Sequence, residues 1–164
     1  MYMSNELLSN IDIIEYCKLF KINLHECMSK DLYNDITART GCYVINLENS
    51  VAGNGTHWTC LCIASHYVMY FDSFGLPIPE PIKAFVFRYK PNVTIIYSSD
   101  IIQSLESVNC GWFCIFFMWW ITVKNQYSPN SYRNLNIHNA LYSFNRGKND
   151  SIIQKNIKYI LLTI

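Results

Sequence analysis

The chain has 164 residues and a mass of 19.2 kDa, which fits one domain of ordinary size. Hydrophobic residues make up 51% of it and aromatic residues 15%, so there is ample material for a core. Charged residues account for only 15%, and the formal net charge of +1 argues against nucleic acid as a dominant partner. We therefore predict a single domain over residues 1–164.

The N-terminal part predicts one helix and one strand. A helix is expected over residues 10–19, with Ser9 or Asn10 as its N-cap, because its apolar residues recur on one face. An irregular stretch is expected over residues 20–39. The run Gly41-Cys42-Tyr43-Val44-Ile45-Asn46-Leu47 is mostly apolar and predicts a strand.

The middle of the chain predicts a hairpin followed by a helix and another strand. Turn residues Ser65-His66 separate two strand-like runs, and three prolines then form a stiff connector. The expected segments are, in order, a loop over 49–55, strands over 56–64 and 67–71, a helix over about 79–89 and a strand over 93–97.

The last third is dominated by an apolar run from Cys110 to Val123. This run is shorter than the ~18–20 residues that a membrane span needs, so we predict a buried helix and no membrane association. Residues 128–150 are rich in Asn and Ser, and residues 151–162 predict a closing helix. These segments together predict an α+β fold with a central mixed sheet packed against the helix that begins at Cys110.

Four polar residues stand where these segments begin or end: His57, Asp72, Gln103 and Cys110. A cysteine is a good nucleophile only as the thiolate, which a nearby imidazolium or a helix N-terminus favours. A histidine in that role needs an acceptor to fix its tautomer, and the intermediate needs donors for its oxyanion. We therefore predict Cys110 as nucleophile, His57 as base, Asp72 as orienter, and Gln103 with the Cys110 backbone N–H as oxyanion donors.

The expected topology brings these residues together. His57 would begin one strand of the hairpin and Asp72 would end the other, so an antiparallel pairing places the two side by side. Cys110 would lie at a helix N-terminus, where the helix dipole and unpaired N–H groups favour an anion.

Each of these residues also has a simpler interpretation when taken alone. Cys110 could be a packed core cysteine, His57 a strand histidine, Asp72 a turn residue and Gln103 a surface amide. Together the four supply every part that a thiol nucleophile needs, and this joint pattern favours the catalytic interpretation.

The remaining thiols do not indicate a metal site. Cys60, Cys62 and His66 lack the Cys-x2-Cys pairing of zinc sites, and alternate residues of a strand simply share a face. Cys114 follows Cys110 by one helical turn, so a core position is favoured over a resolving thiol. The sequence requires no cofactor and predicts no metal.

The stretches Gly55-Thr56-His57-Trp58, Asp72-Ser73-Phe74-Gly75 and Gln103 to Cys110-Gly111 resemble the adenovirus maturation protease (adenain) and its relatives in virophages and virus-like DNA transposons. The resemblance covers roughly residues 41–120. It implies a cysteine protease with the roles given above. Adenovirus enzymes usually carry Glu where Asp72 stands, and Asp is usual in the related SUMO-deconjugating (Ulp-type) proteases. Gln103 lies seven positions before Cys110, and this spacing matches the adenovirus proteases.

The resemblance implies a substrate cleft walled by Trp58 and Gly111, cleavage after glycine, and viral capsid and core precursors as substrates. Two alternatives stay open: a deubiquitinating or SUMO-type deconjugating protease, and a catalytically dead capsid-associated domain. Trp58 could equally be ordinary core packing.

Adenovirus proteases are activated by a disulfide-linked viral peptide and by DNA, so the resemblance raises both as partners, although the low net charge weakens the case for DNA. The peptide's attachment point stays open among Cys17, Cys27, Cys42, Cys60 and Cys62. The odd number of cysteines, seven, and the absence of a secretory signal predict an intracellular or virion-enclosed protein. The resemblance implies that the cell is an infected host and that the protein is packaged in the virion.

Overall fold

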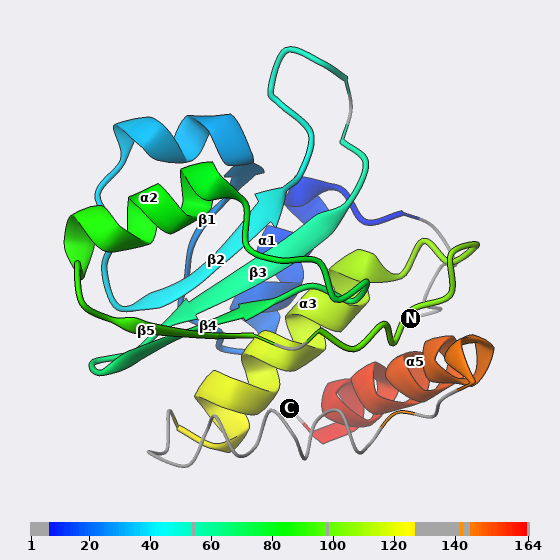
Figure 1. The fold of residues 1–164 in the computed structure, drawn as a ribbon. Coiled ribbons are helices and arrows are strands. Elements are labelled where there is room, and N and C mark those ends of the chain that lie inside the picture. The colour runs from blue at the N-terminus through cyan, green and yellow to red at the C-terminus, as the bar shows by residue number, and fades with distance from the viewer. Residues whose placement is uncertain (1–6, 54, 98, 127–141, 143–144, 164) are drawn as a thin grey trace.

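A computed structural model describes residues 7–53, 55–97, 99–126, 142 and 145–163 (Figure 1). Its centre is a five-stranded mixed sheet with the strand order β1-β2-β3-β4-β5. The two outer pairs are parallel, and the pairs β2–β3 and β3–β4 are antiparallel. The mixed sheet expected from the sequence is therefore present.

The elements follow the predicted order, with boundaries that differ by a few residues. Ser9 caps the first helix through a reciprocal pair of hydrogen bonds with Asp12, as one of the two predicted caps. The elements are α1 (Asn10–Leu19), β1 (Leu24–Ser29), a 3-10 helix η1 (Lys30–Asp35), β2 (Gly41–Asn46), β3 (Trp58–Ile63), β4 (Tyr67–Phe71), α2 (Glu80–Tyr89), β5 (Thr94–Tyr97), α3 (Cys110–Trp119), a π-helical turn η2 (Trp120–Lys124) and α5 (Arg146–Thr163).

One prediction was wrong: the stretch before residue 40 is not irregular. It contains β1 and η1, and β1 forms an edge strand parallel to β2. The sequence Leu24-His25-Glu26-Cys27-Met28-Ser29 lacks a regular alternation of apolar and polar residues, and only Cys27 in it is buried. Backbone pairing with β2 and packing against α1 create this strand, so local pattern alone does not reveal it.

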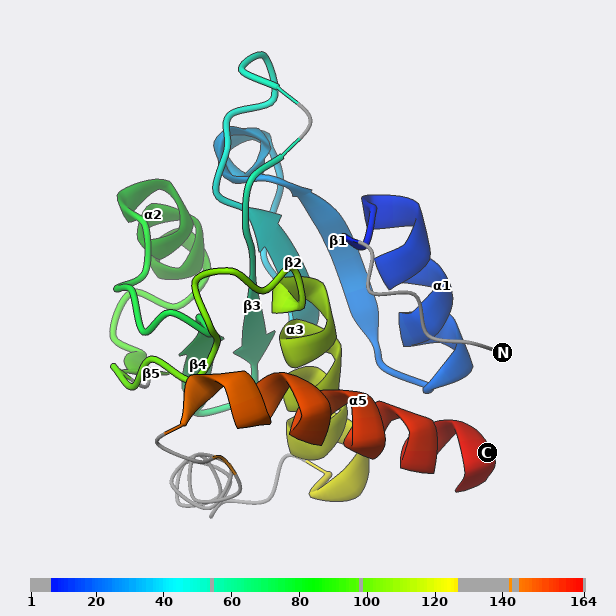
Figure 2. The same ribbon diagram turned by 90° about the vertical axis from the view of Figure 1, so that its right-hand side faces the viewer.

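The sheet has a helical layer on each face (Figure 2). Alternate residues of the central strands supply two separate cores, because successive strand side chains point to opposite faces. Val44 and Cys60 belong to the core shared with α1, α3 and α5. Ile45 and Leu61 belong to the core shared with η1 and α2.

Helix α3 is the most buried helix of the described chain, since every residue from Cys110 to Met118 is buried. It packs on the face of β3, and its Phe117 ring stacks on Phe71 of β4 with centroids 4.6 Å apart and ring planes 12° apart. Within the described residues, no helix has both the length and the apolar character needed to cross a bilayer.

The stack between Phe71 and Phe117 gives a first prediction. Replacement of Phe117 by Ala removes a fully buried ring, and we expect the free energy of unfolding to fall by about 3–5 kcal/mol in urea denaturation. The control is Val51→Ala, at a side chain that is 95% exposed, which should change the value by less than about 0.5 kcal/mol. A loss below 1 kcal/mol for Phe117→Ala, where about 3–5 is expected, would show that α3 is not anchored at this point.

Candidate active site

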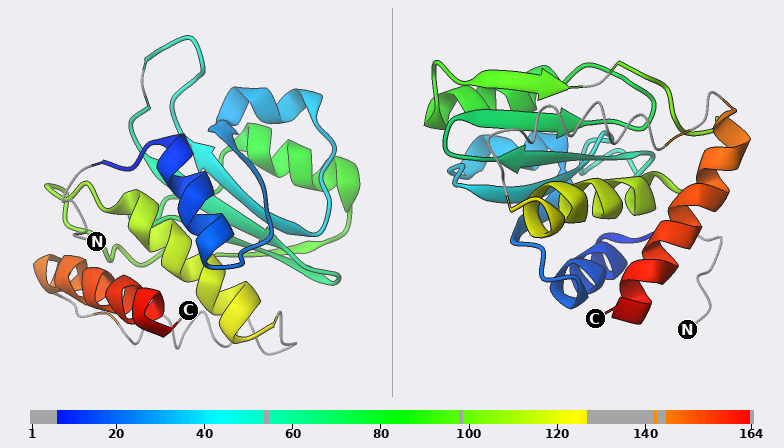
Figure 3. Two further views of the ribbon diagram at one scale, coloured as in Figure 1. Left: turned by 180° about the vertical axis from the view of Figure 1, so that it is seen from behind. Right: turned by 90° about the horizontal axis from the view of Figure 1, so that it is seen from below.

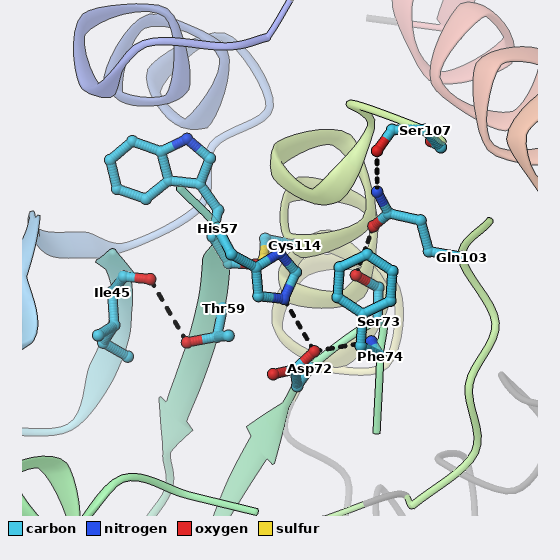
Figure 4. A network of polar contacts seen from close by, with 10 residues as sticks. Ile45, His57, Thr59, Asp72, Ser73, Phe74, Gln103, Ser107 and Cys114 are labelled. Carbon is cyan, nitrogen blue, oxygen red and sulfur yellow. Dashed lines mark hydrogen bonds and ion pairs between the residues drawn. The ribbon is translucent and has the colours of Figure 1, made fainter. Parts of the chain in front are cut away.

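The antiparallel pairing of β3 and β4 brings His57 and Asp72 into contact. His57 immediately precedes β3, Asp72 immediately follows β4, and Cys60 is the partner of Phe71 in the register. Nε2 of His57 donates to Oδ1 of Asp72 over 2.9 Å, and both residues are buried (Figure 4). The contact predicted from the hairpin is therefore present.

The turn after β4 fixes the carboxylate. The backbone N–H of Phe74 donates to the same Oδ1 of Asp72 over 2.7 Å, and the N–H of Gly75 donates to the Asp72 carbonyl. Gly75 has φ +67°, a conformation that a side chain at this position would strain. The Phe74 ring covers the imidazole of His57 with centroids 4.7 Å apart, so it shields the pair from water.

Cys110 is the first residue of α3, and it lies close enough to His57 to interact with the imidazole. Burial lowers the pKa of His57, but its hydrogen bonds to Asp72 and to the Cys110 thiol, together with the charges of both, outweigh that effect and raise the pKa to about 9. Because Nε2 is occupied by Asp72, Nδ1 is the ring nitrogen left for the thiol. The arrangement favours the protonated imidazolium form of His57.

The N-terminus of α3 leaves donors free for an anion. Asn109 occupies the N-cap position, yet its side chain makes no capping hydrogen bond to the helix. The N–H groups of the first turn, including that of Cys110, therefore have no side-chain cap. A developing oxyanion beside Cys110 would meet these N–H groups and the positive end of the helix dipole.

Gln103 is buried and its amide orientation is fixed. Its Nε2 donates to the Ser107 carbonyl over 2.8 Å, and since a carbonyl only accepts, this contact assigns the nitrogen. Its Oε1 accepts from the Ser73 hydroxyl over 2.6 Å. The second N–H of the amide is not used by either contact, and it is the donor that an oxyanion hole requires. Gln103 is thus not the surface amide of the simpler interpretation.

The loop that delivers His57 is held at its base by Asn46 and Glu48. The Asn46 side chain accepts from the N–H of Thr56, and the Glu48 carboxylate accepts from the N–H of Gly55 over 2.7 Å. Gly55 has φ +95°, and a Cβ there would collide with the Asn46 amide. Only glycine fits this position without moving the loop.

The two residues expected to line a substrate cleft have different surroundings. Trp58 lines a cleft of about 360 Å³, together with Leu8, Met28 and Leu32, and its indole N–H donates to the Leu8 carbonyl over 2.8 Å. Trp58 thus packs against the segment at Leu8 and also lines the cleft. Gly111 does not line this cleft among the described residues: it is buried, and a Cβ on it would lie 3.2 Å from the Leu8 side chain. Its lack of a side chain serves close packing of α3.

The other cysteines are all buried. Cys114 donates to the Trp58 carbonyl, which agrees with its predicted core position. Burial raises the pKa of Cys27 to about 12 and raises those of Cys60 and Cys62 well above the ordinary value. None of the five cysteines considered as peptide attachment points is exposed, and Cys27 lines the same cleft as Trp58.

Sequence reasoning missed the residues that hold the polar groups in place. Ser73 is fully buried, its hydroxyl holds Gln103, and its carbonyl accepts from the N–H groups of Ile102 and Gln103. In the sequence, the only indication of this role of Ser73 is that it directly follows Asp72. Asn149 and Asp150 of α5 also contact this region, at a sequence distance that no local pattern could have revealed.

Comparisons with known proteins identify the fold. No protein-family model and no curated protein matches the sequence. Among solved structures, the ASFV pS273R protease matches with a TM-score of 0.51 and 14% identity over 80% of this chain and 66% of that chain. The Se-Met form of the same protease matches with a TM-score of 0.48 and 14% identity over 77% of this chain and 63% of that chain. A structure of AvrA delL154 with IP6 and CoA matches with a TM-score of 0.46 and 16% identity over 68% of this chain and 47% of that chain.

We base the fold assignment on the match with the TM-score of 0.51. The protein shares its fold with the ASFV pS273R protease. The chain spans less than two thirds of the length of the matched structures. The relation to adenain in particular stays a prediction.

The raised pKa of His57 predicts a pH dependence of stability. An imidazole that titrates near 9 in the folded protein and near 6.5 when unfolded binds more protons folded than unfolded between these values. Its stabilising contribution is therefore complete below pH 6.5 and is lost as the pH rises through 9. Urea denaturation of the wild type should show a free energy of unfolding that falls over this window.

The matched control is His57→Gln, which keeps an amide donor beside Asp72 but cannot titrate. Its free energy of unfolding should fall less between pH 6.5 and 9 than that of the wild type. Identical slopes for both proteins would contradict the assignment of a stabilised imidazolium at His57.

Proposed function

We propose that the protein is a cysteine endopeptidase. The observation that carries the proposal is the buried His57–Asp72 pair, and it is supported by Cys110, which begins α3 and contributes to the raised pKa of His57. The fold shared with a viral protease supports it. Cys110 is the nucleophile, His57 the base and Asp72 the orienting acceptor.

The reaction follows from these positions. The Cys110 thiolate attacks the peptide carbonyl carbon, and the resulting oxyanion accepts from the Gln103 amide and the Cys110 backbone N–H. The imidazolium of His57 protonates the leaving amine, which leaves a thioester on Cys110. Neutral His57 then takes a proton from water, and the hydroxide displaces the thiol and completes hydrolysis.

We further propose that the substrates are viral capsid and core precursors, cut after glycine in the infected cell and the virion. Trp58 follows His57 in the sequence and lines the cleft of about 360 Å³, which supports a substrate passage beside the histidine; the resemblance supports glycine at the cleavage site. A short viral peptide that docks at this cleft near Cys27 is proposed as activator. Asp72, the acid usual in deconjugating enzymes, supports ubiquitin-like conjugates as the alternative substrate.

A substrate panel tests the proposal. Fluorogenic peptides ending in Gly-Gly should be cleaved, whereas Cys110→Ala should reduce turnover to background because no nucleophile remains. Ubiquitin and SUMO conjugates, supplied in parallel, separate the two substrate classes. Cleavage that persists in Cys110→Ala would overturn the mechanism, and cleavage of conjugates alone would favour the deconjugating alternative.

Variants of Gln103 test the oxyanion donor. We expect Gln103→Ala to lower kcat by about 100-fold with little change in KM, because the contact is made mainly in the transition state. Gln103→Glu should be at least as damaging, since a carboxylate repels the oxyanion. The melting temperature of each variant provides the control. A large fall in melting temperature with kcat preserved in both would instead assign Gln103 a purely structural role.

A further inference from the structure

The first turns of α5 contact the segment that joins Gln103 to Cys110. Nδ2 of Asn149 donates to the Ile102 carbonyl over 2.7 Å, and Asn149 is fully buried. Oδ1 of Asp150 accepts from Nδ2 of Asn109 over 2.9 Å and also from the Ser107 hydroxyl. Figure 3 (right) shows this end of α5 beside the chain that leads into α3.

These contacts fix the orientation of Gln103 from two directions. Asn149 holds the carbonyl of Ile102, directly before Gln103, while the N–H groups of both residues donate to the Ser73 carbonyl. Asp150 holds the side chain of Ser107, whose carbonyl accepts from the Gln103 amide. Through these bonds, α5 determines where the remaining N–H of the amide points.

The same contacts fix the start of α3. The carbonyl of Asn109 accepts from the N–H of Phe113 and begins the helix, while its backbone N–H donates to the Ser107 hydroxyl. Its side chain turns toward Asp150 and so does not cap the first turn. Asp150 therefore both places Cys110 and keeps the N–H groups beside it free.

We propose that Asn149 and Asp150 are positioning residues that hold the oxyanion donor and the nucleophile in register. This inference rests on the proposed function. Neither residue touches the reacting atoms. Packing of α5 alone would be served at least as well by apolar residues, because a buried amide and a partly buried carboxylate stabilise a fold little beyond the hydrogen bonds they satisfy.

The variants Asp150→Ala, Asn149→Ala and Asp150→Asn test the proposal. The two alanine variants should lower kcat by about 10-fold or more with KM within about 2-fold, because a misplacement of ~1 Å at catalytic groups can cost 100-fold. Asp150→Asn keeps an oxygen that accepts from both partners, so it should retain kcat within about 3-fold. Ser151→Ala, at the exposed neighbouring position, is the control and should leave kcat unchanged.

A double-mutant cycle separates positioning from general stability. If Asp150 acts through Gln103, Asp150→Ala should cost much less in a Gln103→Ala background than in the wild type. Equal losses in both backgrounds would overturn the coupling to Gln103. Full kcat in Asp150→Ala and Asn149→Ala would overturn the proposal altogether.

The rate of Cys110 alkylation by iodoacetamide, measured against pH on folded protein, gives a readout that needs no substrate. We expect Asp150→Ala to slow it and Asp150→Asn to restore it. If the wild type cleaves no substrate, the proposed protease function fails, while the alkylation profile still decides whether Asp150 positions Cys110. An unchanged profile in Asp150→Ala would then overturn the positioning role.

Discussion

The hydrogen bond between His57 and Asp72 depends on the antiparallel pairing of β3 with β4. Neither residue is inside a strand, but the register places the beginning of one strand beside the end of the other. Both residues are buried, and the Phe74 ring covers the imidazole, so the charge interaction acts in a medium of low polarity. The raised pKa of His57 is a consequence of this geometry.

The position of Cys110 depends on the burial of α3. A helix buried from Cys110 to Met118 can only lie against the sheet, and its first residue then meets His57 at the beginning of the central strand β3. Its N-terminal N–H groups remain available because Asn109 bonds to α5 instead of capping the helix. Hydrophobic burial thus holds α3 in place, and its uncapped first turn leaves N–H donors available.

Three segments far apart in sequence converge on the loop between Gln103 and Cys110. Ser73 approaches from the end of β4, Asn149 and Asp150 from α5, and α3 begins at its end. The side chains of Gln103, Ser107 and Asn109 each have a partner from another element, so the loop is held without regular secondary structure of its own. This arrangement explains how an irregular segment can hold the Gln103 amide in one orientation.

The sequence by itself determined the elements from α1 to α3 apart from β1 and η1, and the contact between His57 and Asp72. It did so because strand, helix and turn preferences are local, and because the hairpin connecting β3 and β4 is too short to permit another pairing. It did not reveal β1, whose residues show no apolar period and which exists through pairing with β2.

Tertiary structure alone decided how the site is supported. The burial of Gly111 under Leu8, the bond from Trp58 to the Leu8 carbonyl and the contacts of Asn149 and Asp150 all join residues more than 40 positions apart. Such contacts leave no periodic signal in a single sequence, since they arise only when the helices have packed against the sheet and each buried polar group must find a partner.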